Sequence, residues 1–195
     1  MKPNIRPEEE NLLEVSPADR LDLDLANVDL TIKKLGRTVL TCLITDDPEG
    51  TFRVAMLLGL VDDGVEWRDS LIVPMVRLAV ALGEIGRFDA VVKLLAKIGH
   101  QAEDPTQKDW TGDEAVARGC VEVGNGDFAS AAVSLNGDHA PGLPTVFANL
   151  ANAVLFDSAE RLKDSRRAMS DARKAFSKCS ELRQWMGRTN DSTER

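Results

Sequence analysis

The chain has 195 residues, of which 43% are hydrophobic and 29% charged, a composition typical of one ordinary or large globular domain. Its net charge of −8 disfavours a general nucleic-acid binder, because an acidic surface repels the phosphate backbone. Aromatic residues make up only 5% and Tyr is absent, which disfavours β-sandwiches and β-barrels.

The cysteines indicate a reducing compartment. Cys42, Cys120 and Cys179 are odd in number, far apart and free of any CxxC motif, so they form neither a disulfide framework nor a zinc site.

The amino terminus lacks the apolar region of a signal peptide, and apolar runs such as Val54–Leu60 are too short to span a bilayer. We therefore expect a soluble cytoplasmic protein with neither nucleic-acid nor membrane partners.

The first helix signal follows a short polar segment. Residues 1–15 carry a Glu run and two prolines, and we expect them to be disordered. A capping box with Pro at the first helical position follows at Ser16-Pro17-Ala18-Asp19. Apolar residues then recur at helical spacing, at Leu21, Leu25, Val28, Ile32, Leu35, Val39 and Leu43. The alternation of Leu and Asp over Leu21–Leu25 leaves a short strand open as the alternative.

Two further helices are predicted before residue 90. Asp47-Pro48-Glu49 has the cap, the proline and the acidic first turn of a helix start, and Asp62-Asp63-Gly64 ends that element. Ser70 is the expected cap of the next helix, which runs to about Ile85. Its Pro74 is expected in the first turn, where the backbone N–H has no helical partner to lose.

The second half of the chain shows similar signals for helix starts and loops. Asp104-Pro105 and Thr111-Gly112-Asp113 are expected helix starts, and residues 140–144 form a loop because they contain two prolines and a glycine. No Pro or Gly occurs from residue 145 to 186, a stretch too long for a typical single helix. We therefore expect two antiparallel helices with a break near Asp164-Ser165. The residues after 187 are expected to fray.

Charge is distributed unevenly. Residues 1–29 hold three basic and eight acidic side chains, whereas residues 160–195 hold ten basic and six acidic. The basic last helix is expected to complement an acidic neighbour within the fold, or alternatively to meet an acidic partner.

Two segments of the chain repeat at a spacing of forty residues. In each, a helix ends at a glycine, an aromatic residue follows two positions later, and a small or β-branched apolar residue comes three positions after that. The matched pairs are Gly86 and Gly126, Phe88 and Phe128, and Val91 and Ala131. Glycine at such a turn supplies the left-handed conformation that often ends a helix, so the pattern predicts helical hairpins.

This pattern resembles the tetratricopeptide repeat (TPR). Leu78 and Ala79 match the family's Leu-Gly/Ala pair, and Gly119 and Ala131 match its small positions in the second copy. The sequence departs from the family at Arg118, where Leu is expected, in its missing closing proline, and in its repeat length. The match covers roughly residues 74–104 and 114–144. It implies an all-α domain over 16–187, with seven to nine helices in antiparallel hairpins stacked as a short right-handed TPR-like α-solenoid.

The resemblance also implies a binding surface. The first helix of each hairpin would line a concave groove, and this groove would bind an apolar peptide or amphipathic helix, from a partner or from the chain's own termini. The expected partner-binding residues are Val73, Val76, Val80, Glu84, Asp113, Val116, Cys120 and Val123. The predicted function is a non-catalytic adaptor, chaperone-like protein or scaffold for a protein or peptide partner. A self-associating structural subunit is the alternative.

Other motifs support chemistry less well. Gly124–Ala129 has G-x-G-x-x-A spacing, the mark of a dinucleotide-binding enzyme, but Asp127 would face the phosphates and the ribose-binding acid is missing. His100 and His139 lie at expected helix ends, and the Asp46-Asp47 and Asp62-Asp63 pairs are expected helix caps. Trp110 is expected either between hairpins or as an exposed anchor. We therefore expect no catalytic residue, cofactor or metal.

Overall fold

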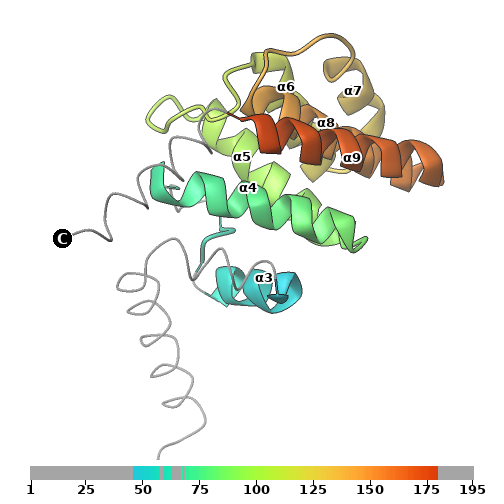
Figure 1. The fold of residues 1–195 in the computed structure, drawn as a ribbon. Coiled ribbons are helices and arrows are strands. Elements are labelled where there is room, and N and C mark those ends of the chain that lie inside the picture. Colours follow the sequence, from blue (N-terminus) through green and yellow to red (C-terminus); the bar gives the residue numbers. More distant parts are fainter. Residues whose placement is uncertain (1–45, 58, 63–66, 68, 180–195) are drawn as a thin grey trace, which may run out of the picture.

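The computed structural model describes residues 46–57, 59–62, 67 and 69–179, and within these ranges it contains helices and no strand (Figure 1). This confirms the all-α prediction for the described residues. The helices are α3 (Pro48–Leu57), α4 (Asp69–Glu84), α5 (Phe88–Glu103), α6 (Glu114–Gly124), α7 (Phe128–Ser134), α8 (Leu143–Ser158) and α9 (Leu162–Lys178). None of these helices combines the length and hydropathy needed to cross a bilayer. The expected capping box at Ser16, the helix or strand after it, and both expected disordered ends lie outside the described residues.

Helix α3 begins where the sequence predicts. The Asp47 carboxylate accepts a hydrogen bond from the Gly50 amide at 2.8 Å, and the Thr51 hydroxyl donates to the Asp47 carbonyl at 2.7 Å. These contacts satisfy groups that the first turn leaves unpaired. The helix ends at Leu57, ahead of the expected end, because Gly59 adopts a left-handed φ of +68°.

The two predicted glycine turns have the same hydrogen-bond pattern. After α4, the Arg87 amide donates to the Leu82 carbonyl at 2.8 Å and the Gly86 amide to the Gly83 carbonyl at 3.1 Å. After α6, the Asp127 and Gly126 amides make the equivalent bonds at 2.9 and 3.1 Å. Gly86 and Gly126 have φ of +79° and +75°. These are Schellman motifs, and they confirm the predicted left-handed glycines.

A third hairpin repeats this turn without glycine. Helices α8 and α9 are joined through Glu160, whose φ is +56°, and the Arg161 amide donates to the Phe156 carbonyl at 2.7 Å. The two expected helices are therefore present, but the break lies at Glu160 rather than near Asp164-Ser165. A glutamate in the left-handed region gives no sequence signal, because that region normally favours glycine.

The helices of each hairpin approach closely at small residues. A Cβ on Gly119 of α6 would lie 2.6 Å from the Leu135 Cγ. In the third hairpin the buried Ser165 hydroxyl donates to the Ala153 carbonyl across the helix pair at 2.9 Å. Small residues thus bring the helices together in the second and third hairpins.

Four local predictions need correction. Helix α4 begins at Asp69, so Ser70 lies within the helix rather than at its cap, and Pro74 lies in the helix interior rather than in its first turn. Asp104 begins a turn instead of a helix, because its carboxylate is occupied by the Thr106 amide at 2.9 Å and the Thr106 hydroxyl at 2.7 Å. The expected loop over residues 140–144 ends at Gly142, and Pro144 lies in the first turn of α8.

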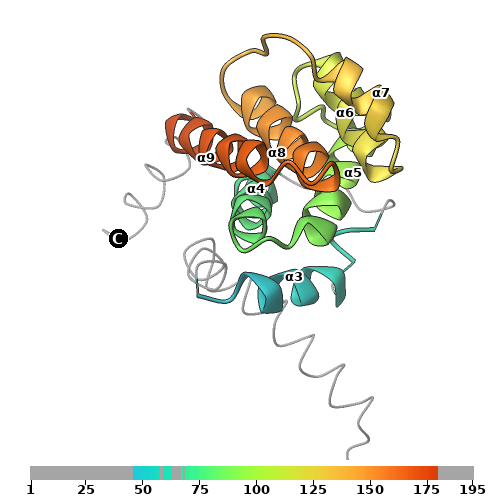
Figure 2. The same ribbon diagram turned by 90° about the vertical axis from the view of Figure 1, so that its right-hand side faces the viewer.

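The hairpins form one closed bundle around a single core. Each helix packs on the next within a hairpin, and α5 also packs on α6. In addition, α8 packs on α4, α5 and α6, and α9 packs on α4. Both views show α4 between α3 and α9 (Figures 1 and 2). The repeats of a solenoid contact only their neighbours, so the contact of the third hairpin with the first departs from that arrangement.

Candidate functional site

Six of the eight expected partner-binding residues lie in the core. Each is at most 5% exposed, and the six are Val73, Val76, Val80, Val116, Cys120 and Val123. Burial also raises the pKa of the Cys120 thiol to about 12, so this cysteine is not a ready nucleophile.

The chain's own third hairpin covers this face. Val76 and Ala79 of α4 and Phe147 of α8 surround a residual cavity of only about 10 Å³. The sequence left open whether a partner or a terminal part of the chain fills the expected groove. In the structure α8 packs on α4, α5 and α6, and each of the six side chains is buried, so they do not form an open surface.

The other two expected residues remain at the surface. Asp113 is the N-cap of α6, and its Oδ1 accepts hydrogen bonds from the Ala115 and Val116 amides at 3.0 and 3.2 Å. Glu84 ends α4 and lines a different depression, which the sequence did not predict.

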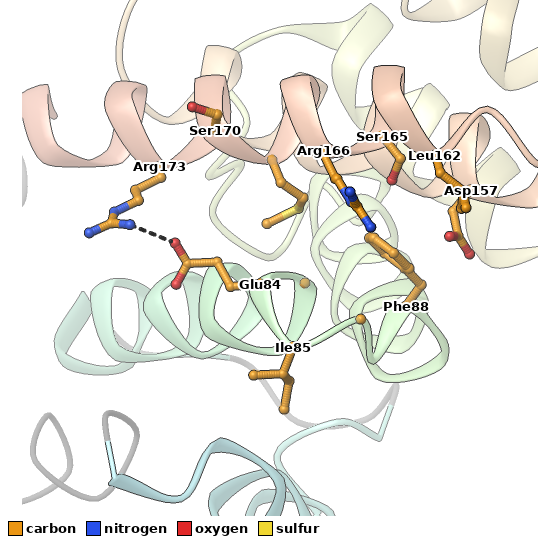
Figure 3. Close-up of a pocket in the computed structure, with 12 residues that line it drawn as sticks. Glu84, Ile85, Phe88, Asp157, Leu162, Ser165, Arg166, Ser170 and Arg173 are labelled. Atoms are coloured by element: carbon orange, nitrogen blue, oxygen red, sulfur yellow. Dashed lines mark ion pairs between the residues drawn. The ribbon is translucent and has the colours of Figure 1, made fainter.

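This depression, which we call the turn groove, has a volume of about 520 Å³ and lies between the α4–α5 turn and α9 (Figure 3). Its lining includes Ile85 and Phe88 on one side and Leu162, Arg166 and Arg173 of α9 on the other. Ile85 is 52% exposed and Leu162 55% exposed. Figure 3 shows Phe88 pointing toward α9, whereas the Ile85 side chain points away from it, so the apolar lining between the two sides comes from Leu162 and the partly buried Phe88.

The floor of the turn groove depends on a glycine. A Cβ on Gly83 would lie 2.6 Å from both the Sδ and the Cε of Met169, so the methionine side chain rests directly against the α4 backbone. Met169 is buried there. This contact brings α9 close to α4 and sets the depth of the groove.

Helix α9 gives one side of the turn groove a basic character. Arg173 makes an ion pair with Glu84 at 3.4 Å, whereas the exposed Arg166 has no carboxylate partner among the described residues. Figure 3 shows Arg166 reaching from α9 toward Phe88. The acidic side chains of the lining are Glu84 and the partly buried Asp157. Over its whole length α9 carries six basic and two acidic residues.

An ion-pair cluster joins the start of α3 to the turn groove. Arg87, which stands between the lining residues Gly86 and Phe88 in the sequence, contacts Asp89 at 3.0 Å and Glu49 of α3 at 2.6 Å through its guanidinium. Hydrogen bonds to these two carboxylates raise the pKa of Arg87, and Arg87 lowers that of Asp89. The described chain therefore begins near the α4–α5 turn, which forms one wall of the groove.

His139 pairs with the α6 cap. Its Nδ1 lies 3.1 Å from the Asp113 Oδ2 and its Nε2 lies 3.2 Å from the Leu135 carbonyl oxygen, so both ring nitrogens already contact acceptors. Burial acts to raise the pKa of Asp113, but hydrogen bonds from His139 and the two cap amides outweigh it and lower that pKa. The pair links the loop before α8 to the start of α6.

The glycine-rich segment over Gly124–Ala129 is the second hairpin turn. It follows a helix, not a strand. The Asp127 carboxylate accepts a hydrogen bond from the Ser130 amide at 3.2 Å and so caps the start of α7. A Cβ on Gly124 would lie 2.4 Å from the Ala96 Cβ, so this glycine allows α5 and α6 to pack. These contacts account for the spacing without a nucleotide.

The remaining candidates have local partners. His100 lies 3.5 Å from Glu103 on α5, and the partly buried Trp110 ring lies under the Lys108 ammonium at 4.1 Å. Asp47 caps α3, while Asp63 lies outside the described residues. Within the described ranges, no group of three or more His, Cys, Asp or Glu side chains is arranged to hold a metal ion.

No family model, curated protein or solved structure matches this chain. Of the turn-groove residues, sequence reasoning identified only Glu84 as a contact residue, and it assigned Glu84 to another surface. One sequence signal, the basic last helix, pointed to this place.

Proposed function

We propose that this protein is a non-catalytic interaction module. It binds, in the turn groove, a segment of a protein partner that carries both carboxylates and apolar side chains. The carrying observation is the exposed Leu162, together with the partly buried Phe88, in a groove that is bordered by the basic helix α9. Burying these side chains against a partner would contribute about 25 cal/mol for each Å² removed from water. Arg166, which has no carboxylate partner among the described residues, would favour a carboxylate on that partner.

The size of the turn groove supports this proposal. A volume of about 520 Å³ is within the usual range for ligand-binding clefts, roughly 300–1,000 Å³. The mixture of aliphatic walls and a charged edge is typical of a site that binds an amphipathic helix or an extended peptide. A partner with leucine on one face and carboxylates on the other would contact both parts.

The repeat pattern supports an interaction role as well. Three hairpins share one turn geometry, and Glu160 follows Gly126 by 34 residues, which is the usual length of a TPR. The right-handed TPR-like solenoid itself stays a prediction. The proposed site differs from the one the resemblance implies, because it lies at the hairpin turns and not on the first-helix face.

Peptide selection tests the proposal. A random peptide library displayed on phage is selected against the full chain, and the enriched peptides are assayed against two variants. Leu162→Glu places a charge in the turn groove, while Val133→Glu places the same charge on α7, where the valine is 78% exposed. We expect acidic, leucine-containing peptides whose binding falls at least tenfold with Leu162→Glu only. Equal binding to both variants would contradict the proposal.

The alternative functions predict other results. A nucleotide-binding enzyme would show a rise in melting temperature in a screen with nucleotides and metal ions, lost on Gly126→Val. A self-associating subunit would show a concentration-dependent mass by light scattering. The proposed monomeric module predicts neither.

A further inference from the structure

We infer that the turn groove has an internal occupant, the chain's own residues 8–29, which compete with an external partner for the same site. This inference rests on the proposed function. It is carried by three observations: where the described chain begins, the charge of α9, and the composition of the two segments outside the described residues.

The path of the chain favours this occupant. The ion pair between Glu49 and Arg87 places the start of α3 next to the turn that forms one wall of the groove. Residues 30–45 connect the acidic segment to this point. At full extension sixteen residues span about 50 Å, so the segment can reach the groove without any change in the described fold.

Net charge favours residues 8–29 over residues 180–195 as the occupant of the turn groove. Residues 8–29 carry eight acidic side chains and a single basic one, Arg20, with leucines interspersed among the acids. Residues 180–195 carry three acidic and three basic side chains, so they have no net charge to match α9. The unpaired Arg166 and the exposed Lys163 and Arg167 give α9 the complementary sign.

Tethering makes internal binding effective. A segment that belongs to the same chain meets the groove at a high effective concentration, so even a weak contact competes with a free partner. The groove would then be filled in the isolated protein and would open only to a partner that binds more tightly.

A competition experiment with the full chain tests the inference. A fluorescent peptide of residues 8–29 is titrated into the wild type and into a tail-serine chain, in which four of the five leucines of the segment are replaced without a change of charge. The replacements are Leu12→Ser, Leu13→Ser, Leu21→Ser and Leu23→Ser. We expect the peptide to bind the tail-serine chain at least tenfold more tightly than the wild type, because the internal competitor has been weakened.

Two charge variants locate the binding site in the tail-serine chain. Arg166→Glu changes a lining residue of the turn groove, and we expect it to weaken peptide binding at least fivefold. Arg118→Glu makes the same change of charge on an exposed residue of α6, paired with Glu114, and should leave binding unchanged. Equal losses in both variants would overturn the inference, because they would show general charge attraction.

The remaining outcomes are also decisive. Equal peptide affinity for the wild type and the tail-serine chain, or no binding to either, overturns the internal occupant. If library peptides still bind the groove in that case, the proposed function survives alone. A wild-type dimer in light scattering that the serine substitutions dissociate would assign the segment to a second copy of the chain and would also overturn the inference.

Discussion

Single residues at the hairpin turns control the stability of the repeat units. Gly86 and Gly126 have positive φ and no atom within 4 Å of an added Cβ, so the cost of a substitution there is backbone strain alone. Glu160 adopts the same conformation and accepts that strain. Substitutions at the two glycine turns and at the Glu160 turn should therefore change the free energy of unfolding in opposite directions.

Gly86→Val and Gly126→Val should each lower the free energy of unfolding by about 1–2 kcal/mol, because a β-branched residue is strained in the left-handed region. Glu160→Gly should raise it by about 0.5–1 kcal/mol, since glycine removes the strain. Urea denaturation of the three variants measures both effects. A loss of stability in Glu160→Gly would contradict the shared turn geometry.

The Asp113 cap gives a pH-dependent prediction. Its lowered pKa means that the carboxylate stabilises the fold above the unfolded pKa of about 3.9 and loses this effect as the pH falls through the lower folded value. Asp113→Ala should therefore cost about 1 kcal/mol at pH 7, and the difference from wild type should shrink below about pH 4. Asp138→Ala, on an exposed neighbour, should stay within about 0.5 kcal/mol at both pH values. A pH-independent Asp113 penalty would contradict the cap.

At the scale of the elements, the hairpins pack through glycines. A Cβ on Gly99 of α5 would lie 2.8 Å from both the Ala117 carbonyl oxygen and the Val121 amide nitrogen of α6, which are backbone atoms that cannot move independently. A Cβ on Gly83 of α4 would meet only the flexible end of Met169. The first contact is rigid and the second is adaptable.

Gly99→Ala should lower the free energy of unfolding by about 1–3 kcal/mol, although alanine is the better helix former, because the two helices must separate. Gly83→Ala should cost less than about 1 kcal/mol, since Met169 can change rotamer. Thermal and urea unfolding of the matched pair check this order. A more stable Gly99→Ala protein would show that α5 and α6 are packed less closely than described.

The sequence predicted elements better than their contacts. Asp47, Asp113 and the two turn glycines act locally, so their roles could be identified from their neighbours in the chain. The turn at Glu160 could not, because a strained glutamate carries no local signal. The position of α8 over α4, α5 and α6 depends on contacts between distant residues, and local patterns in a single sequence do not predict such contacts.

Contacts between distant residues also explain why the sequence predicted the wrong face as the candidate site. The expected partner-binding face was apolar, as predicted, but an apolar helix face is equally suited to a partner or to the chain's own core. The structure places α8 there. The turn groove is formed by α9 returning to the α4–α5 turn, so it exists only at the level of the whole molecule.

At that level, the closed core predicts a strong response to a buried charge. Val80→Asp should lower the free energy of unfolding by several kcal/mol, because the carboxylate would be enclosed without a partner. Val133→Asp, on the exposed side of α7, should change it by less than about 0.5 kcal/mol. Denaturant unfolding compares the two. An unchanged stability in Val80→Asp would mean that the first-helix face is open.

Methyl NMR of the full chain tests the central claim, that partners bind in the turn groove and not on the first-helix face. The tightest peptide from the library selection is titrated into the labelled protein, and the methyl signals of the groove residues Leu162 and Met169 are compared with those of the core residues Val76 and Val80. We predict saturable shifts at Leu162 and Met169 and none at Val76 and Val80. Shifts at the two valines with unchanged groove signals would contradict the account.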